Sequence, residues 1–322
     1  MPVNQVRISN LSVVYRLGRQ ETRALDNVSL DIPTSRYTIG IVGESGSGKT
    51  TLGMSILNLI RRPGEISSGT VEFEGKNVLQ FDREHLRRYR GEDVAMIYQS
   101  AMNSLNPVKS ILDHVTEVFK EHTSISDSEA KERAMALLSS VGIREDRVNG
   151  YPHEFSGGMR QRCVIAMALA LKPKILIADE PTSALDVVVQ RQILDLIASY
   201  VRDNGLSLVL ITHEVALANG LLDNLAVMYK GELAEIGATE KVLQNPLHPY
   251  SEMLIDSILT LESTRDTLLQ TDRKLRETSL SSTGNACKYA ARCKYAFEMC
   301  KQERPILKEV EKGRYVACHK YN

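Results

Sequence analysis

The sequence predicts an α/β fold in which short buried strands alternate with helices. Three apolar runs support this prediction: "TIGIV" at 38–42, "ILIA" at 175–178 and "LSLVLITHE" at 206–214. Such short runs, rich in branched residues and bounded by glycine or polar residues, are typical of buried strands. The first run continues through a glycine-rich loop into "LGMSILNLI", whose apolar residues suit a helix. A strand followed by a loop and a helix is the repeating unit of an α/β protein.

Composition narrows the class of protein. The chain has 322 residues, of which 43% are hydrophobic and 25% charged, as in an ordinary globular protein. Its formal net charge is zero, so nothing indicates nucleic-acid binding. No apolar run approaches the roughly 18–20 residues that span a bilayer, and the first residues do not resemble a secretory signal. We therefore expect a cytosolic protein, in which structural disulfides are rare.

The glycine-rich loop "GESGSGKTT" (43–51) matches the phosphate-binding pattern GxxxxGK[ST]. Its glycines let the backbone approach an anion, and the N–H groups at the start of the following helix point at that anion. We expect Lys49 to reach the β- and γ-phosphates of a nucleotide and the Thr50 hydroxyl to bind Mg²⁺. The residues predicted to bind ATP are Gly43, Ser45, Gly46, Ser47, Gly48, Lys49, Thr50 and Thr51.

Polar pairs end the other two predicted strands. Asp179 and Glu180 follow the second strand, and alternating side-chain directions allow them two different roles. Asp179 suits the Mg²⁺ shell, and Glu180 suits polarising the water that attacks the γ-phosphate. His213, at the end of the third strand, is then interpreted as a γ-phosphate contact. A histidine there would otherwise more often be structural.

A second glycine loop leads into a long apolar, alanine-rich stretch within "HEFSGGMRQRCVIAMALALKP" (153–173). The tripeptide Ser156-Gly157-Gly158 leads into this alanine-rich helix and forms a second potential anion site. One ATP does not need two such sites from one subunit. We therefore predict that this loop covers the nucleotide of a partner subunit.

These motifs together resemble the nucleotide-binding subunits of ABC transporters, over residues 4–260. In that comparison "FSGGM" (155–159) is the signature motif, "SALD" (183–186) the D-loop with Asp186, and His213 the switch histidine. Gln99, in "MIYQSAMNSLNP", matches the Q-loop glutamine that joins Mg²⁺ and water to the membrane subunits. Tyr15 matches the aromatic residue that stacks on adenine, although a lone strand tyrosine is more often packing.

The resemblance implies a P-loop NTPase core of ABC type with an antiparallel β subdomain and an inserted helical subdomain at about 100–165. It also implies a head-to-tail pair of ATPase subunits, with each ATP between one phosphate loop and the partner's Ser156-Gly157-Gly158. Because the catalytic matches are complete, we expect a hydrolytic site in which Glu180, His213 and Gln99 act, and in which Thr50, Gln99 and Asp179 bind Mg²⁺. Phe155 and Met159 depart from the LSGGQ consensus, so this part of the comparison depends on the serine and two glycines.

Short sequence motifs indicate one branch of this family. "SLNPV", "YPHEFSGGMRQR" and "NPLHPYSEMLIDSI" resemble the oligopeptide/dipeptide importers, in the first of their two types of ATPase subunit. The resemblance implies a paralogous ATPase partner (a homodimer is the alternative), two transmembrane permease subunits and, indirectly, an extracytoplasmic substrate-binding protein. The chain would lie on the cytoplasmic face of the membrane.

The transported substrate is not readable from an ATPase subunit. Peptides are our first expectation, and oligosaccharides or nickel complexes are the alternatives within this branch. Two other classes fit less well. A soluble ABC ATPase of DNA repair or translation would usually carry a long coiled coil or two ATPase halves, and a nucleotide-sensing module would have lost Glu180 or His213.

The C-terminal end poses a separate question. After a polar linker at 261–284, a Cys-rich region at 285–322 contains four of the five cysteines, in "CKYAARCKYAFEMC" and at 318. A segment this short seldom folds without a staple. Disulfides are disfavoured by the expected compartment, and the gaps of five and six residues are wide for zinc.

Four thiolates around a [4Fe–4S] cluster tolerate varied spacing, and the importer branch often ends in a tail associated with such a cluster. The resemblance therefore implies an iron–sulfur site at Cys287, Cys293, Cys300 and Cys318, with Zn²⁺ as the alternative. The family's usual prolines are replaced by Lys288 and Ala291. The fifth cysteine, Cys163, lies in the apolar helix after the signature and is predicted to be a buried thiol. We expect the tail to be a structural knot, because no electron donor site is evident.

Overall fold

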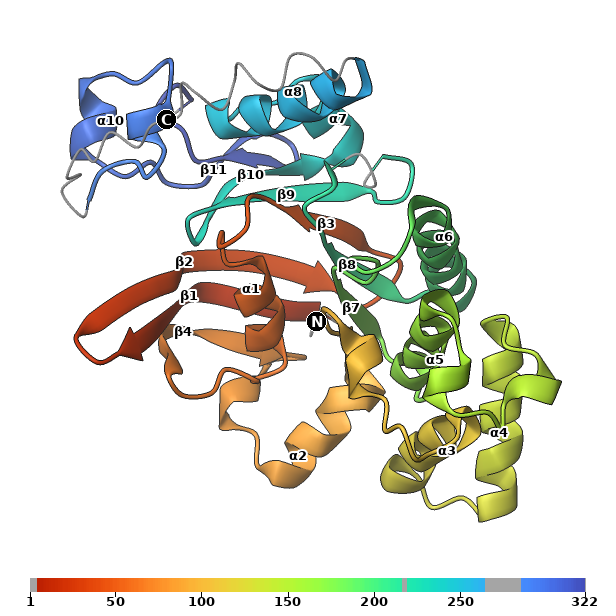
Figure 1. Ribbon diagram of the computed structural model, residues 1–322. Helices are drawn as coiled ribbons and strands as arrows, with labels where there is room; N and C mark the ends of the chain where they lie inside the picture. The colour runs from red at the N-terminus through yellow and green to blue at the C-terminus, as the bar shows by residue number, and fades with distance from the viewer. Residues whose placement is uncertain (1–4, 216–218, 264–284, 322) are drawn as a thin grey trace.

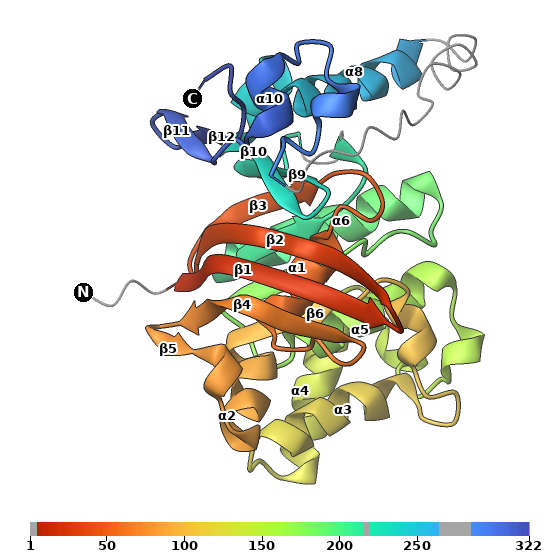
Figure 2. The same cartoon turned by 90° about the vertical axis from the view of Figure 1, so that its left-hand side faces the viewer.

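The computed structural model describes residues 5–215, 219–263 and 285–321 of the chain. They form two sheets and a group of helices (Figures 1 and 2). The linker predicted at 261–284 falls almost entirely outside the described residues. None of the helices in the described part combines the length and apolarity that a membrane crossing needs.

The larger sheet has eight strands in the order β11-β12-β10-β9-β3-β8-β7-β6. Strands β6, β7, β8, β3 and β9 run parallel to one another, and β10 and β12 pair antiparallel at the edge. The three strands expected from apolar runs are β3, β7 and β8 at its centre. Its strand bounds are Thr38–Val42 (β3), Val94–Ile97 (β6), Ile175–Asp179 (β7), Ser207–Ile211 (β8), Asn224–Tyr229 (β9), Glu232–Ala238 (β10), Lys308–Glu311 (β11) and Arg314–Val316 (β12).

The smaller sheet is antiparallel, in the order β2-β1-β4-β5. Helix α1 (Lys49–Ile56) lies between the two sheets, as Figure 2 shows, and Leu52 and Ile56 are fully buried in the core that both sheets share. The fold therefore has the antiparallel β subdomain that was expected. Its strands are Gln5–Leu17 (β1), Gln20–Pro33 (β2), Gly64–Phe73 (β4) and Lys76–Asn77 (β5).

The expected helical subdomain is present as α3, α4 and α5, which pack on one another at the other end of the molecule (Figure 1). Each begins at a serine whose hydroxyl accepts a hydrogen bond from the third backbone N–H of the helix: Ser110, Ser126 and Ser156. Among the remaining helices, α7 and α8 pack against β10 and α6 packs against α5. The helix bounds are Arg83–Arg88 (α2), Ile111–His122 (α3), Asp127–Ser140 (α4), Gly157–Leu169 (α5), Val187–Asn204 (α6), Thr239–Gln244 (α7), Pro249–Ser263 (α8) and Glu298–Gln302 (α10).

The C-terminal region is not an independent appendage. Its strand β12 pairs with β10, so that Glu235 lies opposite Val316 and Ile236 opposite Tyr315. The Arg314 side chain is buried and donates to the buried Glu235 carboxylate, with 2.8 Å between Nη2 and Oε1. The tail thus completes the edge of the sheet that carries the phosphate loop, a feature that its sequence did not predict.

Candidate active site

The predicted site residues follow parallel strands, and parallel strands present their carboxyl ends at one edge of the sheet. The phosphate loop follows β3, Gln99 follows β6, Glu180 follows β7 and His213 follows β8. Since β3, β8, β7 and β6 are neighbours, the topology gathers these segments from positions more than 160 residues apart.

The phosphate loop needs its glycines for two reasons. Gly43 and Gly48 have φ angles of 152° and 102°, which side chains disfavour. A Cβ atom on Gly43 would lie 2.2 Å from the Met228 carbonyl oxygen, and one on Gly48 would lie 2.4 Å from the Ala24 carbonyl oxygen. The loop is therefore packed against β2 and β9. Gly48 also precedes α1 without a side-chain cap, so the first N–H groups of the helix have no capping side chain to satisfy them.

Lys49 is buried at the first position of α1. Its Nζ donates to the carbonyl oxygens of Gly43 (2.8 Å) and Glu44 (3.0 Å), which hold it across the loop. Burial lowers the pKa of Lys49, while the carboxylates of Glu180, Asp179 and Glu44 raise it. The neighbouring Ser47 hydroxyl is buried without a hydrogen-bond partner. Of the other predicted loop residues, Ser45, Gly46 and Thr50 are exposed and Thr51 is half-buried.

Asp179 is buried at the end of β7. Burial raises the pKa of its carboxyl group, and a hydrogen bond from the Thr50 side chain lowers it. Its second carboxylate oxygen, Oδ1, is buried without any partner. An unpaired buried carboxylate oxygen beside a hydroxyl fits Mg²⁺, which is usually bound through one or two carboxylates together with substrate phosphates.

Glu180 lies between the two other predicted catalytic side chains. Its Oε2 accepts from the Gln99 amide at 2.9 Å, and its Oε1 lies 3.0 Å from His213 Nδ1. The Glu180 backbone has a φ of 44° and donates its N–H to the Ile211 carbonyl of β8. This conformation is uncommon for a residue other than glycine, and such strain concentrates at functional sites. The structure thus brings together Gln99, Glu180 and His213, the three side chains predicted to be catalytic.

Helices α5 and α6, which follow the signature loop and the D-loop, pack against each other. Ser156 caps α5, and Asp186 caps α6 by accepting from the Val189 N–H at 3.0 Å. A Cβ atom on Gly158 would lie 2.7 Å from Val189, so α5 and α6 approach closely through this glycine. Figure 1 shows α5 in the helical group, apart from α1. Within one chain the signature loop is therefore not placed beside the phosphate loop.

Tyr15 is half-buried on β1. Its ring covers Gly64 of β4, because a Cβ atom on that glycine would lie 2.7 Å from the ring. This contact is the packing role that a strand tyrosine often has. Stacking on adenine stays a prediction.

The four C-terminal cysteines are free thiols that lie near one another. Cys300 is buried and the other three are half-buried, and the Cys287 N–H donates to the Cys300 carbonyl at 2.9 Å. Burial raises the pKa of Cys287 to about 11, and the three neighbouring thiols contribute to this increase. Within 5–215, 219–263 and 285–321, however, no three His, Cys, Asp or Glu side chains are arranged to hold a metal ion. An iron–sulfur cluster and its Zn²⁺ alternative therefore stay predictions for these cysteines.

Cys163 is fully buried on α5, as predicted, and burial raises its pKa to about 12. Two residues near the phosphate loop were not predicted. The Tyr250 hydroxyl accepts from the Glu44 N–H at 2.8 Å, and Arg292 forms an ion pair with the Glu44 carboxylate at 3.0 Å. Both lie more than 200 residues from the loop, so no local pattern could have indicated them.

The fold and this edge of the sheet define an ABC-type ATPase subunit. The family model for the ABC transporter matches residues 25–183, and that for the oligopeptide/dipeptide transporter C-terminal region matches residues 234–300. The chain is 39% identical to the oligopeptide transport ATP-binding protein OppD of Bacillus subtilis, over 97% of this chain and 87% of that protein. It is 37% identical to the dipeptide transport ATP-binding protein DppD of Caldanaerobacter subterraneus, over 98% and 97% of the two chains.

Solved structures agree with this assignment. A dimeric structure of the ATP-binding cassette MJ0796 in a post-hydrolysis state, bound to ADP and phosphate, matches with a TM-score of 0.65 and 28% identity. The match covers 73% of this chain and 98% of that one. The chain belongs to the ABC transporter ATP-binding proteins of the oligopeptide/dipeptide transporter family.

Proposed function

We propose that this chain hydrolyses ATP to power the import of oligopeptides or dipeptides through partner membrane subunits. The observation that carries the proposal is the Glu180 carboxylate, which lies between Gln99 and His213 and directly follows the buried Asp179. Glu180 is the general base that polarises the attacking water, and His213 contacts the γ-phosphate.

The other site residues bind and orient the nucleotide. Lys49 exchanges its two carbonyl partners for the β- and γ-phosphates, and the loop N–H groups hold the same anion. Mg²⁺, held by Thr50, Gln99 and Asp179, would neutralise phosphate charge. The unpaired Oδ1 of Asp179 supports this ligand set.

A Glu180→Gln variant tests the hydrolytic role. We expect it to retain MgATP binding and to lose about 100-fold or more in ATPase rate, the usual contribution of a general base. Glu214→Gln is the matched control, because the Glu214 carboxylate lies 3.9 Å from the other ring nitrogen of His213. We expect this variant to hydrolyse ATP near the wild-type rate. Wild-type turnover by Glu180→Gln would contradict the proposal.

The functional unit is a head-to-tail dimer in this proposal. Each nucleotide is covered by the partner's Ser156-Gly157-Gly158, and Asp186 belongs to the adjoining D-loop. The separation of α5 from α1 within one chain supports this arrangement, as does the dimeric structure of the ATP-binding cassette MJ0796. The partner is a paralogous ATPase subunit, with a homodimer as the alternative.

ATP-dependent dimerisation distinguishes these partners. The Glu180→Gln protein, which should retain its ATP, is passed over a sizing column with MgATP, alone and with a paralogue. A dimer formed only with the paralogue supports the heterodimer, and a dimer formed by this chain alone supports the homodimer. No dimer in either case contradicts the shared-site proposal.

Peptides are the proposed cargo, because the matched relatives are named as oligopeptide and dipeptide transport proteins. We place the chain on the cytoplasmic face of the membrane, bound to two permease subunits and acting indirectly on an extracytoplasmic substrate-binding protein. Uptake of a labelled peptide by cells with and without the gene tests the cargo. If cells without the gene still take up the peptide but no longer take up nickel or an oligosaccharide, the result would favour one of the alternative importers.

The iron–sulfur interpretation of the tail stays a proposal. It is supported by four free thiols that lie near one another, and it is opposed by the absence of a metal-binding arrangement among the described residues. Iron, sulfide and visible absorbance are measured on protein purified without oxygen, for the wild type and for Cys293→Ser. Absence of all three signals in the wild type would reject the cluster.

A further inference from the structure

The C-terminal region contacts the phosphate loop through one arginine. Arg292 ends the short turn Ala290–Arg292, between two of the tail cysteines. Its guanidinium donates two hydrogen bonds to the Glu44 carboxylate, 3.1 Å from Nη1 to Oε2 and 3.0 Å from Nη2 to Oε1. This paired geometry fixes both groups more strictly than a single contact would.

Aromatic side chains hold the same arginine in place. The Arg292 guanidinium carbon lies 6.0 Å from the ring centre of Tyr229 and 5.9 Å from that of Tyr289. Tyr250 packs on both rings and accepts the Glu44 N–H. The backbone and the carboxylate of Glu44 are therefore both fixed, and only the carboxylate contact comes from the tail.

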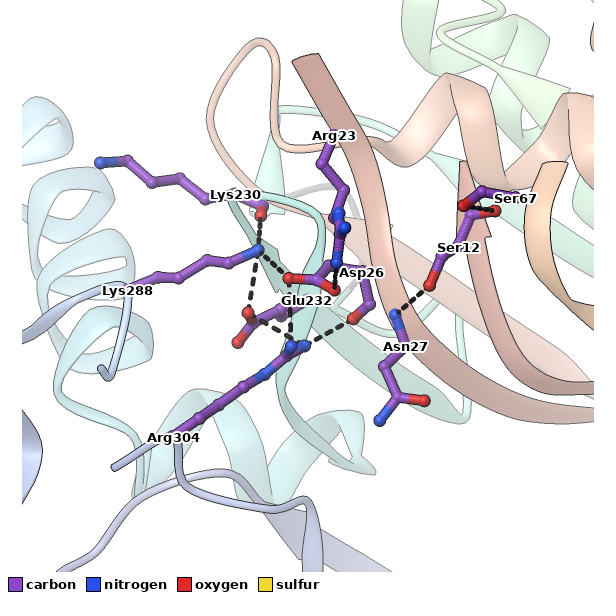
Figure 3. A network of polar contacts seen from close by, with 9 residues as sticks. All are labelled: Ser12, Arg23, Asp26, Asn27, Ser67, Lys230, Glu232, Lys288 and Arg304. Atoms are coloured by element: carbon purple, nitrogen blue, oxygen red, sulfur yellow. Dashed lines mark hydrogen bonds and ion pairs between the residues drawn. The ribbon is translucent and has the colours of Figure 1, made fainter. Parts of the chain in front are cut away.

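A second group of tail contacts lies at the turn between β9 and β10 (Figure 3). Lys288 of the tail lies 2.8 Å from Asp26 and 2.9 Å from Glu232, and its Nζ donates to the Lys230 carbonyl at 2.9 Å. Arg304 forms ion pairs with the same two carboxylates. Gly231, which follows Lys230 in the chain, donates its N–H to the Ser47 carbonyl of the phosphate loop at 2.9 Å.

The charge of Glu44 gives the arginine a role beyond packing. Glu44 belongs to the phosphate loop itself, and its backbone carbonyl accepts from Lys49 Nζ at 3.0 Å. A carboxylate at this position is therefore expected to repel the phosphates that Lys49 binds. An acid in a loop that must hold the polyanionic ATP is unfavourable unless a cation pairs with it. Arg292 is that cation, and its fork also fixes the direction of the carboxylate.

We propose that Arg292 is a positioning residue for ATP binding, which neutralises and orients Glu44 so that the phosphate loop accepts MgATP. The C-terminal region thereby sets the nucleotide affinity of the ATPase. This inference rests on the proposed ATP site at Lys49.

The test is MgATP affinity, measured by titration calorimetry on the full chain. We expect Arg292→Gln to raise the Kd about three- to tenfold, the range of a partly exposed charge pair with paired geometry. Glu44→Gln removes the unfavourable charge and should tighten binding. The double variant Glu44→Gln/Arg292→Gln should match Glu44→Gln, because Arg292 then has no carboxylate to neutralise. Arg292→Lys, which keeps the charge and loses the fork, should fall between wild type and Arg292→Gln.

Lys294→Gln is the matched control, because Lys294 is the next tail cation after Cys293 and pairs with Glu252 of α8 at 2.8 Å. It should bind MgATP as the wild type does, and thermal unfolding and iron content are recorded for every variant. The inference is overturned if Arg292→Gln binds normally, if Lys294→Gln weakens binding equally, or if the double variant is as weak as Arg292→Gln. Lys49→Ala separates the two proposals, since unchanged binding there would refute the ATP site itself.

Discussion

Replacing Arg314 with methionine tests how the C-terminal region is anchored. The Arg314 side chain is 3% exposed, and the Glu235 side chain that it contacts is fully buried. Arg314 also donates to the Asn245 carbonyl. The Glu235 carboxylate accepts backbone N–H groups from Leu247 at 3.0 Å and His248 at 2.9 Å. Methionine keeps an unbranched side chain and removes the charge, which leaves the carboxylate without its cation.

The magnitude follows from this burial. Removing one partner of a buried ion pair costs about 3–5 kcal/mol, because the other charge stays in a low-dielectric site. The two backbone N–H groups still stabilise the carboxylate, so we expect the lower end, about 3 kcal/mol. With a denaturant slope of about 3 kcal/mol per molar urea, the unfolding midpoint should fall by about 1 M.

Urea unfolding followed by circular dichroism measures this shift, and limited proteolysis reports whether the tail detaches first. Lys241→Met is the control. Its pair with Glu311 also ties the tail to the core, at 3.2 Å, but both side chains are about half exposed. We expect a loss below about 1 kcal/mol there. Adding Glu235→Gln to Arg314→Met should recover part of the stability. A midpoint for Arg314→Met within experimental error of wild type would refute the reasoning, as would a double variant no better than the single one.

Three other perturbations test the phosphate loop, a buried histidine and a helix start. Gly48→Ala should weaken MgATP binding in calorimetry and lower the free energy of unfolding by about 1–3 kcal/mol. The new methyl group would clash with the Ala24 carbonyl oxygen, and the backbone φ of 102° at Gly48 is unfavourable for alanine. Burial lowers the pKa of His248 to about 4, so the unfolded chain takes up a proton first as pH falls. Stability should therefore decrease by up to about 3 kcal/mol between pH 6.5 and pH 4, and His248→Gln should remove that dependence in urea titrations. Ser126→Ala should lower the free energy of unfolding by about 1 kcal/mol, since its hydroxyl accepts from the Glu129 N–H at the start of α4.

Each of these predictions has an opposing result. Gly18 also has a positive φ, of 61°, but open space around it, so an equal loss in Gly18→Ala would show that the contact with the Ala24 carbonyl is not the cause of the Gly48 effect. An unchanged pH slope in His248→Gln would show that other groups control acid sensitivity. Equal stability of Ser126→Ala and wild type would show that the cap contributes nothing measurable.

The parallel strands show what local sequence can predict. The apolar runs at 38–42, 175–178 and 206–214 each proved to be a strand, because a run that must be buried on both faces has few other conformations. The residues after each strand carry the chemistry, and parallel strand ends lie at one edge whatever the loop lengths. For this reason Lys49, Glu180 and His213 could be predicted as residues of one site before their contacts were known.

The tail shows the opposite case. Its cysteine spacing predicted a knot, but the described residues hold the region by β-pairing with β10 and by ion pairs. Lys288, which in sequence replaces a proline, pairs with Asp26 and Glu232. These partners are more than 50 residues away in the chain. The local sequence around a lysine or arginine does not predict which distant carboxylate it will pair with.

The sequence by itself determined the class of the protein and the order of its central strands along the chain, and it predicted the residues of the ATP site. Each of these depends on short sequence motifs that can be recognised from a few neighbouring residues. Only the tertiary structure decided that Gln99 and His213 share Glu180, that the tail extends the central sheet, and that Arg292 reaches Glu44. Such contacts depend on how distant segments pack, and packing is a property of the whole fold.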